Sequence, residues 1–207
     1  MEINNFNEIR TLLNWESTDD FYFIQLLQRK KEHPELGSNS RVVKTYYIKN
    51  MDHFNSLEKE IIALCKLYNA RAYIHLQKRS FYKCTMQMLK GITEYILQPD
   101  FEHSYRVWDS VCGQHGNGPK FWVVDVDNPD LEKYDVDLLD LIKFIDEDCE
   151  PGNAFVMTLP TKNGHHLITK PFNLKKFSDK FPEIQVHKNN PTIFYIPTAE
   201  DVKSFQL

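Results

Sequence analysis

The chain has 207 residues, of which 42% are hydrophobic and 26% charged, and it carries 14 Phe, 10 Tyr and 3 Trp. This composition is typical of a globular protein with one substantial core or two small lobes, and it excludes a disordered chain. The formal net charge of -4 argues against a generally basic nucleic-acid coat protein, although it allows a local basic groove.

The four cysteines are scattered and form no paired motif: Cys65, Cys84, Cys112 and Cys149. We expect free thiols in a reducing cytosol rather than a disulfide framework. The polar, acidic N-terminus does not resemble a signal peptide, and no apolar run approaches the length of a membrane span. The expected location is therefore cytoplasmic, with no membrane partner.

In chain order, helical spacing of apolar residues predicts helices at residues 3–14, 52–69, 81–97, 101–111, 136–148 and 172–181, and from Thr198. Runs of β-branched and aromatic residues predict strands at residues 21–28, 41–48, 71–77, 120–127, 154–159, 166–169, 184–187 and 192–196. The first two strands should form an antiparallel hairpin, and the last two should form another strand pair.

A glycine cluster at residues 113–119 is expected to link an N-terminal α/β lobe, residues 1–115, to a second lobe, residues 116–207. The second lobe has the order β-α-β-β-α-β(β). This order predicts an α+β fold in which a hairpin and βα unit precede a split βαβ sheet. That sheet is the ferredoxin-like or RNA-recognition-motif-like arrangement, with helices on one side.

The predicted strand at residues 120–127 ends in two carboxylates one residue apart, Asp125 and Asp127. Side chains alternate along a strand, so both acids should emerge on one face, close enough to share one or two divalent cations. A cation is the usual remedy for the repulsion within such a pair. The alternative is that both acids mark the exposed end of the strand and the turn that follows it.

Two basic residues, Lys78 and Arg79, follow the predicted strand at residues 71–77, and Ser80 can cap the helix at residues 81–97. Cations beside a helix N-terminus suit a phosphate group. The alternative is a solvated turn, which is the commoner role of such a basic pair.

A second motif, Thr161-Lys-Asn-Gly-His-His166, lies on a turn that leads into the strand at residues 166–169. With the acid pair before it, this motif resembles the catalytic core of the archaeo-eukaryotic primase superfamily, the primase–polymerases, over roughly residues 70–197. In that family an apolar strand ends in two acids one residue apart. A small hydroxyl residue, a glycine and a histidine follow at this spacing.

The resemblance implies a DNA primase/polymerase-type nucleotidyltransferase, which synthesises or extends a primer on a single-stranded DNA template. Its substrates would be nucleoside triphosphates and its cofactor Mg²⁺ or Mn²⁺. The small size suggests a replication system of phage or mobile-element origin, in which a replication helicase is a candidate partner.

The site residues implied by the resemblance follow from the two motifs. Asp125 and Asp127 match the metal-binding acids, and His166 matches the histidine that contacts the triphosphate. Thr161 matches the hydroxyl partner of this histidine, and Gly164 matches the glycine that lets phosphates approach the backbone.

Further residues are assigned more loosely. Lys162 is added as a phosphate ligand because of its charge, and the stretch ending in Lys78 and Arg79 resembles a family strand that ends in a basic residue near the nucleotide. His165 should point to the opposite face of the strand from His166 and lie at the surface.

The chain departs from the family at the third motif, where another acid is expected on a later strand. Gln185 or His187 takes that place, and Glu183 lies one residue away. His187 remains a competent metal ligand, but losing one anionic ligand weakens Mg²⁺ binding more than Mn²⁺ binding. Two alternatives stay open: a catalytically lapsed protein that binds nucleic acid or nucleotides, and a metal-dependent nuclease or phosphohydrolase built from Asp125, Asp127, His166 and His187.

Overall fold

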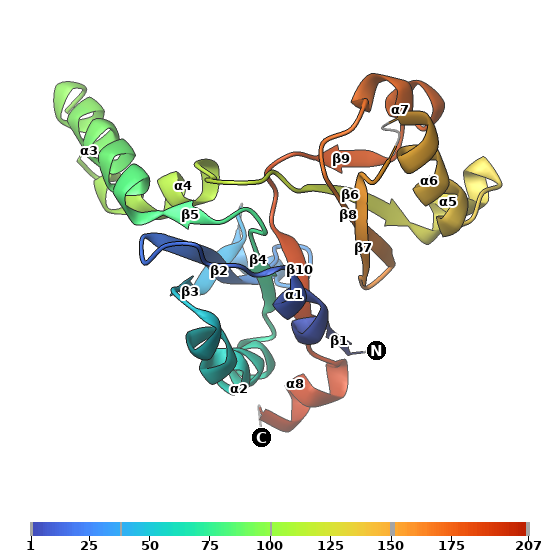
Figure 1. The fold of residues 1–207 in the computed structure, drawn as a ribbon. Coiled ribbons are helices and arrows are strands. Elements are labelled where there is room, and N and C mark those ends of the chain that lie inside the picture. Colours follow the sequence, from blue (N-terminus) through green and yellow to red (C-terminus); the bar gives the residue numbers. More distant parts are fainter. Residues whose placement is uncertain (1, 38, 100, 150–151, 206–207) are drawn as a thin grey trace.

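The computed structural model describes residues 2–37, 39–99, 101–149 and 152–205. The protein is a mixed α+β structure with two antiparallel sheets, each in a lobe of its own (Figure 1). Within these ranges, no helix has both the length and the apolar character that a membrane span requires.

The first sheet is built around β2 (Asp20–Gln28), which is largely buried along its length. This strand pairs antiparallel with β3 (Arg41–Ile48) on one side and with β4 (Arg71–Ile74) on the other. Its first two residues pair in addition with β5 (Arg79–Ser80). The predicted antiparallel hairpin of the first two long strands is confirmed.

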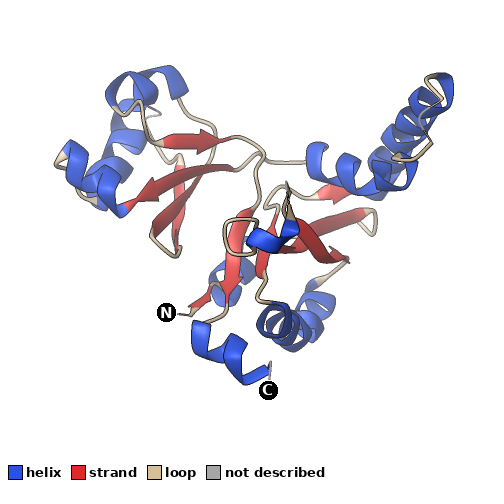
Figure 2. Cartoon of the chain, turned by 180° about the vertical axis from the view of Figure 1, so that it is seen from behind, coloured by secondary structure: helices blue, strands red, loops and turns tan. Residues whose placement is uncertain are grey.

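Helices cover both faces of this sheet, which explains why the apolar residues of β2 do not alternate with polar ones (Figure 2). On one face, Ile24 and Leu26 share an apolar cluster with α1 (Phe6–Leu12) and α2 (Met51–Tyr68). A short helix, η1 (Pro34–Leu36), lies in the connection between β2 and β3.

On the opposite face, Phe21 and Phe23 pack in a second cluster with α3 (Phe81–Leu97) and α4 (Val107–Gln114). A single helical turn, η2 (Ser104–Arg106), precedes α4. Helix α3 extends away from the body of the first lobe as an arm (Figure 1).

The second sheet contains β6 (Trp122–Asp127), β7 (Phe155–Pro160), β8 (Gly164–Thr169) and β9 (Gln185–His187). Its order is β7-β8-β6-β9, and every neighbouring pair is antiparallel. Strand β6, which carries the acid pair, therefore lies in the interior of the sheet.

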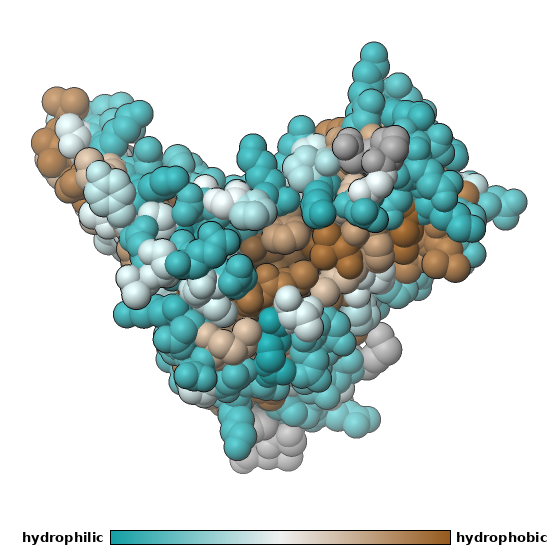
Figure 3. Space-filling view, in the orientation of Figure 1, coloured by the Kyte–Doolittle hydropathy of each residue, from teal (hydrophilic) through white to brown (hydrophobic). Residues whose placement is uncertain are grey.

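One face of the second sheet is covered by helices: α5 (Asn128–Tyr134), α6 (Leu138–Lys143), the π-helix η3 (Phe144–Cys149) and α7 (Leu174–Lys180). Val124 and Val126 of β6 are buried against this layer. The other face of the sheet belongs in part to the first lobe, because Val123, Leu159 and Ile168 join the cluster of Ile24 and Leu26. Figure 3 shows apolar residues gathered in the middle of the molecule between the two lobes.

The prediction that residues 184–187 pair with residues 192–196 is wrong. Strand β9 belongs to the second sheet, whereas β10 (Thr192–Ile196) crosses to the first sheet and runs antiparallel to β4 and to β1 (Ile3–Asn4). Helix α8 (Ala199–Phe205) then packs against α2. The chain from Thr192 onward therefore lies with the first lobe.

Three further elements differ from the predicted ones. The strand expected at residues 71–77 ends at Ile74, because the chain turns before Arg79 pairs with β2. The helix expected at residues 136–148 divides into α6 and η3. After Asp127 the chain enters α5 directly, with Asp127 as its N-cap and Pro129 in the first turn, and not the turn that was the alternative interpretation of the acid pair. The four cysteines are buried free thiols, as expected.

Gly164 is required by the close approach of β8 to β6. A Cβ at this position would overlap the carbonyl oxygen of Val126 and lie 2.8 Å from the Cα of Asp127. We expect Gly164→Ala to lower the free energy of unfolding by about 1–3 kcal/mol, because backbone atoms must shift to admit the methyl group. Gly113→Ala is the matched control, since open space surrounds Gly113. Urea denaturation measures the free energy of unfolding of both variants. Equal stability of the two would contradict the requirement for glycine where β8 approaches β6.

Candidate active site

The residues of the two predicted motifs meet on one face of the second sheet. In the strand register, Asp125 lies between His166 of β8 and Gln185 of β9, and Asp127 lies opposite Gly164. Because side chains alternate, Val124 and Val126 point to the helices while the two acids point to the opposite face. The predicted shared face of Asp125, Asp127 and His166 is thus present.

This face borders a cleft of about 730 Å³ between the two lobes. The second sheet contributes both acids, Thr161, Lys162, His166, Gln185 and His187 to its walls, and the first lobe contributes Arg29, Lys31, Glu32, Arg71 and Tyr73. The cleft therefore combines carboxylates with several cations: the second lobe contributes the acid pair and Lys162, and the first lobe contributes Arg29, Lys31, Arg71 and Glu32. Such a polar, charged lining suits a highly charged small molecule better than an apolar one.

His166 is held at both ring nitrogens. Its Nε2 lies 3.4 Å from Oδ1 of Asp125, and its Nδ1 lies 2.8 Å from Oγ1 of Thr192. The hydrogen bond from His166 lowers the pKa of Asp125 below its ordinary value despite the opposing effect of burial. His187 and Arg29 act on the Asp125 carboxylate in the same direction, so this acid is held in its ionised form.

Asp127 has the opposite character. Burial raises its pKa, and the neighbouring charges of Asp125 and Asp130 raise it further. Two carboxylates on one strand face thus repel each other, and a divalent cation bound between them would relieve this repulsion. The side chains able to hold such a cation are Asp125, Asp127 and, one register step away opposite Val123, His187. Over residues 2–37, 39–99, 101–149 and 152–205, no three His, Cys, Asp or Glu side chains are grouped as a complete metal site.

The turn between β7 and β8 is closed by Thr161. Its backbone N–H donates to the carbonyl of Gly164 at 2.9 Å, and its hydroxyl accepts from the Gly164 N–H at 3.2 Å. Asn163 accepts a backbone hydrogen bond from Asn128, which ties this turn to the end of β6. The hydroxyl of Thr161 therefore shapes the turn, and the close approach that requires Gly164 is to the backbone of β6.

Lys162 takes part in an ion-pair network that crosses the cleft. Its Nζ lies 3.4 Å from Oε1 of Glu32, and Glu32 also accepts two hydrogen bonds from the guanidinium of Arg71, one of them 2.9 Å from Nε to Oε2. Burial opposes ionisation of Glu32, but Arg71 and Lys162 together hold its pKa below the ordinary value. Glu32 thereby links a lysine of the second lobe to an arginine of the first.

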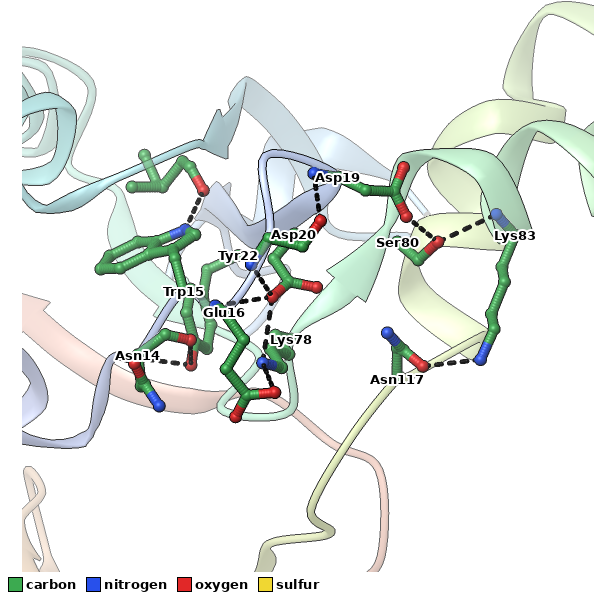
Figure 4. Close-up of polar contacts among 12 residues, drawn as sticks. Asn14, Trp15, Glu16, Asp19, Asp20, Tyr22, Lys78, Ser80, Lys83 and Asn117 are labelled. Atoms are coloured by element: carbon green, nitrogen blue, oxygen red, sulfur yellow. Dashed lines mark hydrogen bonds and ion pairs between the residues drawn. The ribbon is translucent and has the colours of Figure 1, made fainter.

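Lys78 and Arg79 do not line the cleft. Lys78 is buried in the first lobe and donates to Asp20 at 3.0 Å, with Glu16 at 3.1 Å (Figure 4). Burial by itself raises the pKa of Asp20, yet the hydrogen bond from Lys78 and those from the backbone of Glu16 and Ser17 hold it below the ordinary value. Lys78 thus neutralises an internal acid and is not presented to a phosphate.

Arg79 is also fully buried. Its guanidinium donates to the carbonyls of Cys112, Gln77 and Gly113 and contacts Nδ1 of His75 at 2.9 Å. Neither the phosphate nor the solvated-turn interpretation of this basic pair fits these contacts. Ser80 does cap α3, as expected, by accepting from the N–H of Lys83 at 3.1 Å (Figure 4).

His165 points to the helix-covered face rather than outward. The residue is half-buried, and its Nδ1 is enclosed without a hydrogen-bond partner among the described residues. Its expected place at the surface is therefore wrong, because α5–α7 and η3 cover the face to which it points. Its position opposite to His166 is as predicted.

Sequence reasoning missed the main contributions of the first lobe to the site: Arg29 and Arg71 line the cleft, and buried Thr192 contacts His166. The basic run Arg29-Lys30-Lys31 directly after β2 was a usable signal, since cations at the end of a buried strand often face a ligand. Arg71 carries no such signal, because its place at the cleft depends on the pairing of β4 with β2, and Thr192 reaches His166 only because β10 crosses to the first sheet.

Comparison with known proteins gives no match to a family model, a curated protein or a solved structure. The functional interpretation therefore rests on the two motifs and on the geometry of the cleft.

Proposed function

We propose that this protein is a primase–polymerase-like nucleotidyltransferase, which extends a primer on a single-stranded DNA template. One observation carries the proposal: Asp125, Asp127 and His166 lie on one face of the second sheet, at a cleft that also contains Lys162, Arg29 and Arg71. Carboxylates that hold a cation and basic side chains that contact phosphates, together in one cleft, are what a nucleoside triphosphate with its bound cation requires.

The proposed cofactor is Mg²⁺ or Mn²⁺, held by Asp125 and Asp127; among the described residues His187 is not grouped with the two acids as the predicted third ligand. Mg²⁺ is usually bound through one or two carboxylates together with substrate phosphates, so a pair of acids without a complete protein cage fits it. Bound there, the cation would activate the attacking hydroxyl and neutralise the triphosphate. The raised pKa of Asp127 supports this assignment, because burial and two neighbouring acids disfavour its charged form and a bound cation would favour it.

The topology of the second lobe supports the same proposal. We infer that it is an RNA-recognition-motif-like split βαβ sheet, in which β6 and β7 are separated by β8. The order β9-β6-β8-β7, with helices after β6 and after β8, is the one expected for such a sheet. In this arrangement the helix-free face is open to nucleotides where the first lobe does not cover it, and the acid pair lies on that face.

Gln185 favours a second candidate function, binding of nucleotides or nucleic acid without transfer. It lies directly opposite Asp125 in the strand register, which is the position where a third acid would complete the metal site. A neutral amide there leaves the site with less negative charge, and the affinity for Mg²⁺ falls with the number of charged ligands.

The experiment that separates the candidates uses labelled deoxynucleoside triphosphates, a primed single-stranded template, and either Mg²⁺ or Mn²⁺. Primer extension, stronger with Mn²⁺, is the expected result. Nucleotide binding without extension would contradict nucleotidyl transfer and favour the second candidate function, binding without transfer. Degradation of the template would indicate a nuclease instead.

Gln185→Glu should raise Mg²⁺-dependent extension by roughly tenfold, because it adds the missing carboxylate beside Asp125 without changing side-chain length. Gln87→Glu, on the exposed surface of α3, is the matched control and should leave the rate unchanged. An unchanged or lower rate in Gln185→Glu would show that this position does not complete the metal site.

A further inference from the structure

Thr192 is the residue that holds His166 from the other lobe. It is the first residue of β10, in the first sheet, while His166 is on β8, in the second sheet. The Oγ1–Nδ1 distance of 2.8 Å is that of a hydrogen bond. The two residues are 26 positions apart in the chain, and the crossing of β10 between the sheets brings them together.

The direction of this hydrogen bond follows from the burial of Thr192. The residue is fully buried, so its hydroxyl hydrogen has no access to solvent and needs an acceptor within the protein. Among residues 2–37, 39–99, 101–149 and 152–205, the hydroxyl has a single hydrogen-bond partner, which is Nδ1 of His166. If Nδ1 carried the proton and donated, the threonine hydrogen would be buried without an acceptor.

We propose that Thr192 donates to Nδ1 of His166 and thereby fixes the neutral imidazole with its proton on Nε2, directed at Asp125 and the cleft. The hydrogen bond at one ring nitrogen fixes the tautomer of a histidine when the bonded group can only donate or only accept. The 3.4 Å contact of Nε2 with Oδ1 of Asp125 agrees with a donor at Nε2. Thr192 is a positioning residue, since it acts through His166.

This assignment limits what neutral His166 can do. With the proton on Nε2, the nitrogen that faces the cleft has no free lone pair, so it neither ligates a metal nor accepts a proton from a water molecule. It can donate a hydrogen bond to a carboxylate or to a phosphate oxygen. On the proposed function, His166 is therefore a donor to the triphosphate, and in the nuclease alternative neutral His166 does not serve as a general base through Nε2.

The role of His166 as a donor to the triphosphate rests on the proposed function, whereas the tautomer of His166 can be measured without nucleotide. Long-range ¹H–¹⁵N spectra of the ¹⁵N-histidine-labelled protein distinguish a protonated from an unprotonated ring nitrogen. The resonances of His166 are identified by their loss in His166→Gln. We expect Nε2 to be protonated and Nδ1 to be unprotonated; the reverse pattern overturns the proposal.

Two matched variants test the role of the hydroxyl. Thr192→Ser keeps the donor and should keep both ¹⁵N shifts, whereas Thr192→Val keeps the shape and should move the Nδ1 shift toward that of an unbonded nitrogen. Titration with dATP and Mg²⁺ should show binding weakened roughly two- to tenfold by Thr192→Val and unchanged by Thr192→Ser. Identical spectra of the valine variant and the wild type overturn the proposal. If the wild type binds no dATP, the proposed function fails while the spectra still decide the tautomer.

Discussion

Asp127→Asn is expected to reduce primer extension by at least about a thousandfold, because it removes one of the two anionic ligands proposed for the catalytic cation. The same change should leave the melting temperature equal or up to about 3 °C higher. Ionised Asp127 is disfavoured by burial and by the charges of Asp125 and Asp130, and the amide removes this repulsion. Loss of activity together with retained stability is typical of a residue kept for function.

The amide also preserves the local structure. Asp127 is the N-cap of α5, and asparagine caps helices as well as aspartate does. Extension assays and thermal denaturation on the same preparations measure the two effects. Asp179→Asn, an exposed carboxylate on α7, is the control for loss of an acid and should change neither. Extension by Asp127→Asn at the wild-type rate would remove Asp127 from the catalytic site.

The parts of the site that follow a local rule were predictable from the sequence. Alternation along a strand places Asp125 and Asp127 on one face whatever the rest of the fold does. Their meeting with His166 needed one further assumption, that the strand after the Thr161 turn pairs with the acid strand, and the register of β6 and β8 supplies this pairing.

The origin of the opposite wall of the cleft was not predictable in this way, because it depends on where β10 pairs. Residues 192–196 were placed beside residues 184–187 by proximity in the chain, yet they pair with residues 72–74, more than 100 positions earlier. Composition held a usable clue. All five residues of β10 are buried, and four of them form the apolar and aromatic run of residues 193–196, whereas β9 alternates polar and apolar residues like a strand with one covered face.

Lys78 and Arg79 show why a charged pair cannot be assigned from its neighbours alone. Both follow the strand at residues 71–74 and precede a capped helix, the setting of a phosphate site. Whether such a cation faces a ligand or the interior depends on acceptors from distant segments. For Lys78 the acceptor is Asp20, 58 positions away, and for Arg79 two of its carbonyl acceptors are Cys112 and Gly113.

Arg79→Met is expected to lower the free energy of unfolding by about 3–5 kcal/mol, because it leaves several buried carbonyl groups without a donor. Nε of Arg79 donates to the carbonyl of Cys112 at 2.6 Å, and the guanidinium also reaches Gln77 and Gly113. These bonds join the segment before β5 to the end of α4. Hydrogen exchange of the α4 amides should therefore accelerate more than exchange elsewhere.

The guanidinium remains buried because its donors are satisfied by neutral acceptors. Burial lowers the pKa of Arg79 to about 10, which still leaves it charged at neutral pH. Burial, and then the charge of Arg79, lower the pKa of His75 to about 3, so its imidazole is neutral and accepts from the guanidinium. Removing the charge of Arg79 should accordingly let the pKa of His75 rise, although burial still holds it below the ordinary value.

Urea denaturation of Arg79→Met beside Arg41→Met provides the measurement, since Arg41 is exposed at the start of β3 and should tolerate the change. A phosphate-binding Arg79 makes the opposite prediction. Arg79→Met would then be as stable as Arg41→Met and would lose affinity for dATP. Because a buried cation bound to backbone carbonyls cannot also bind a triphosphate, the two roles of Arg79 are distinguished by stability alone.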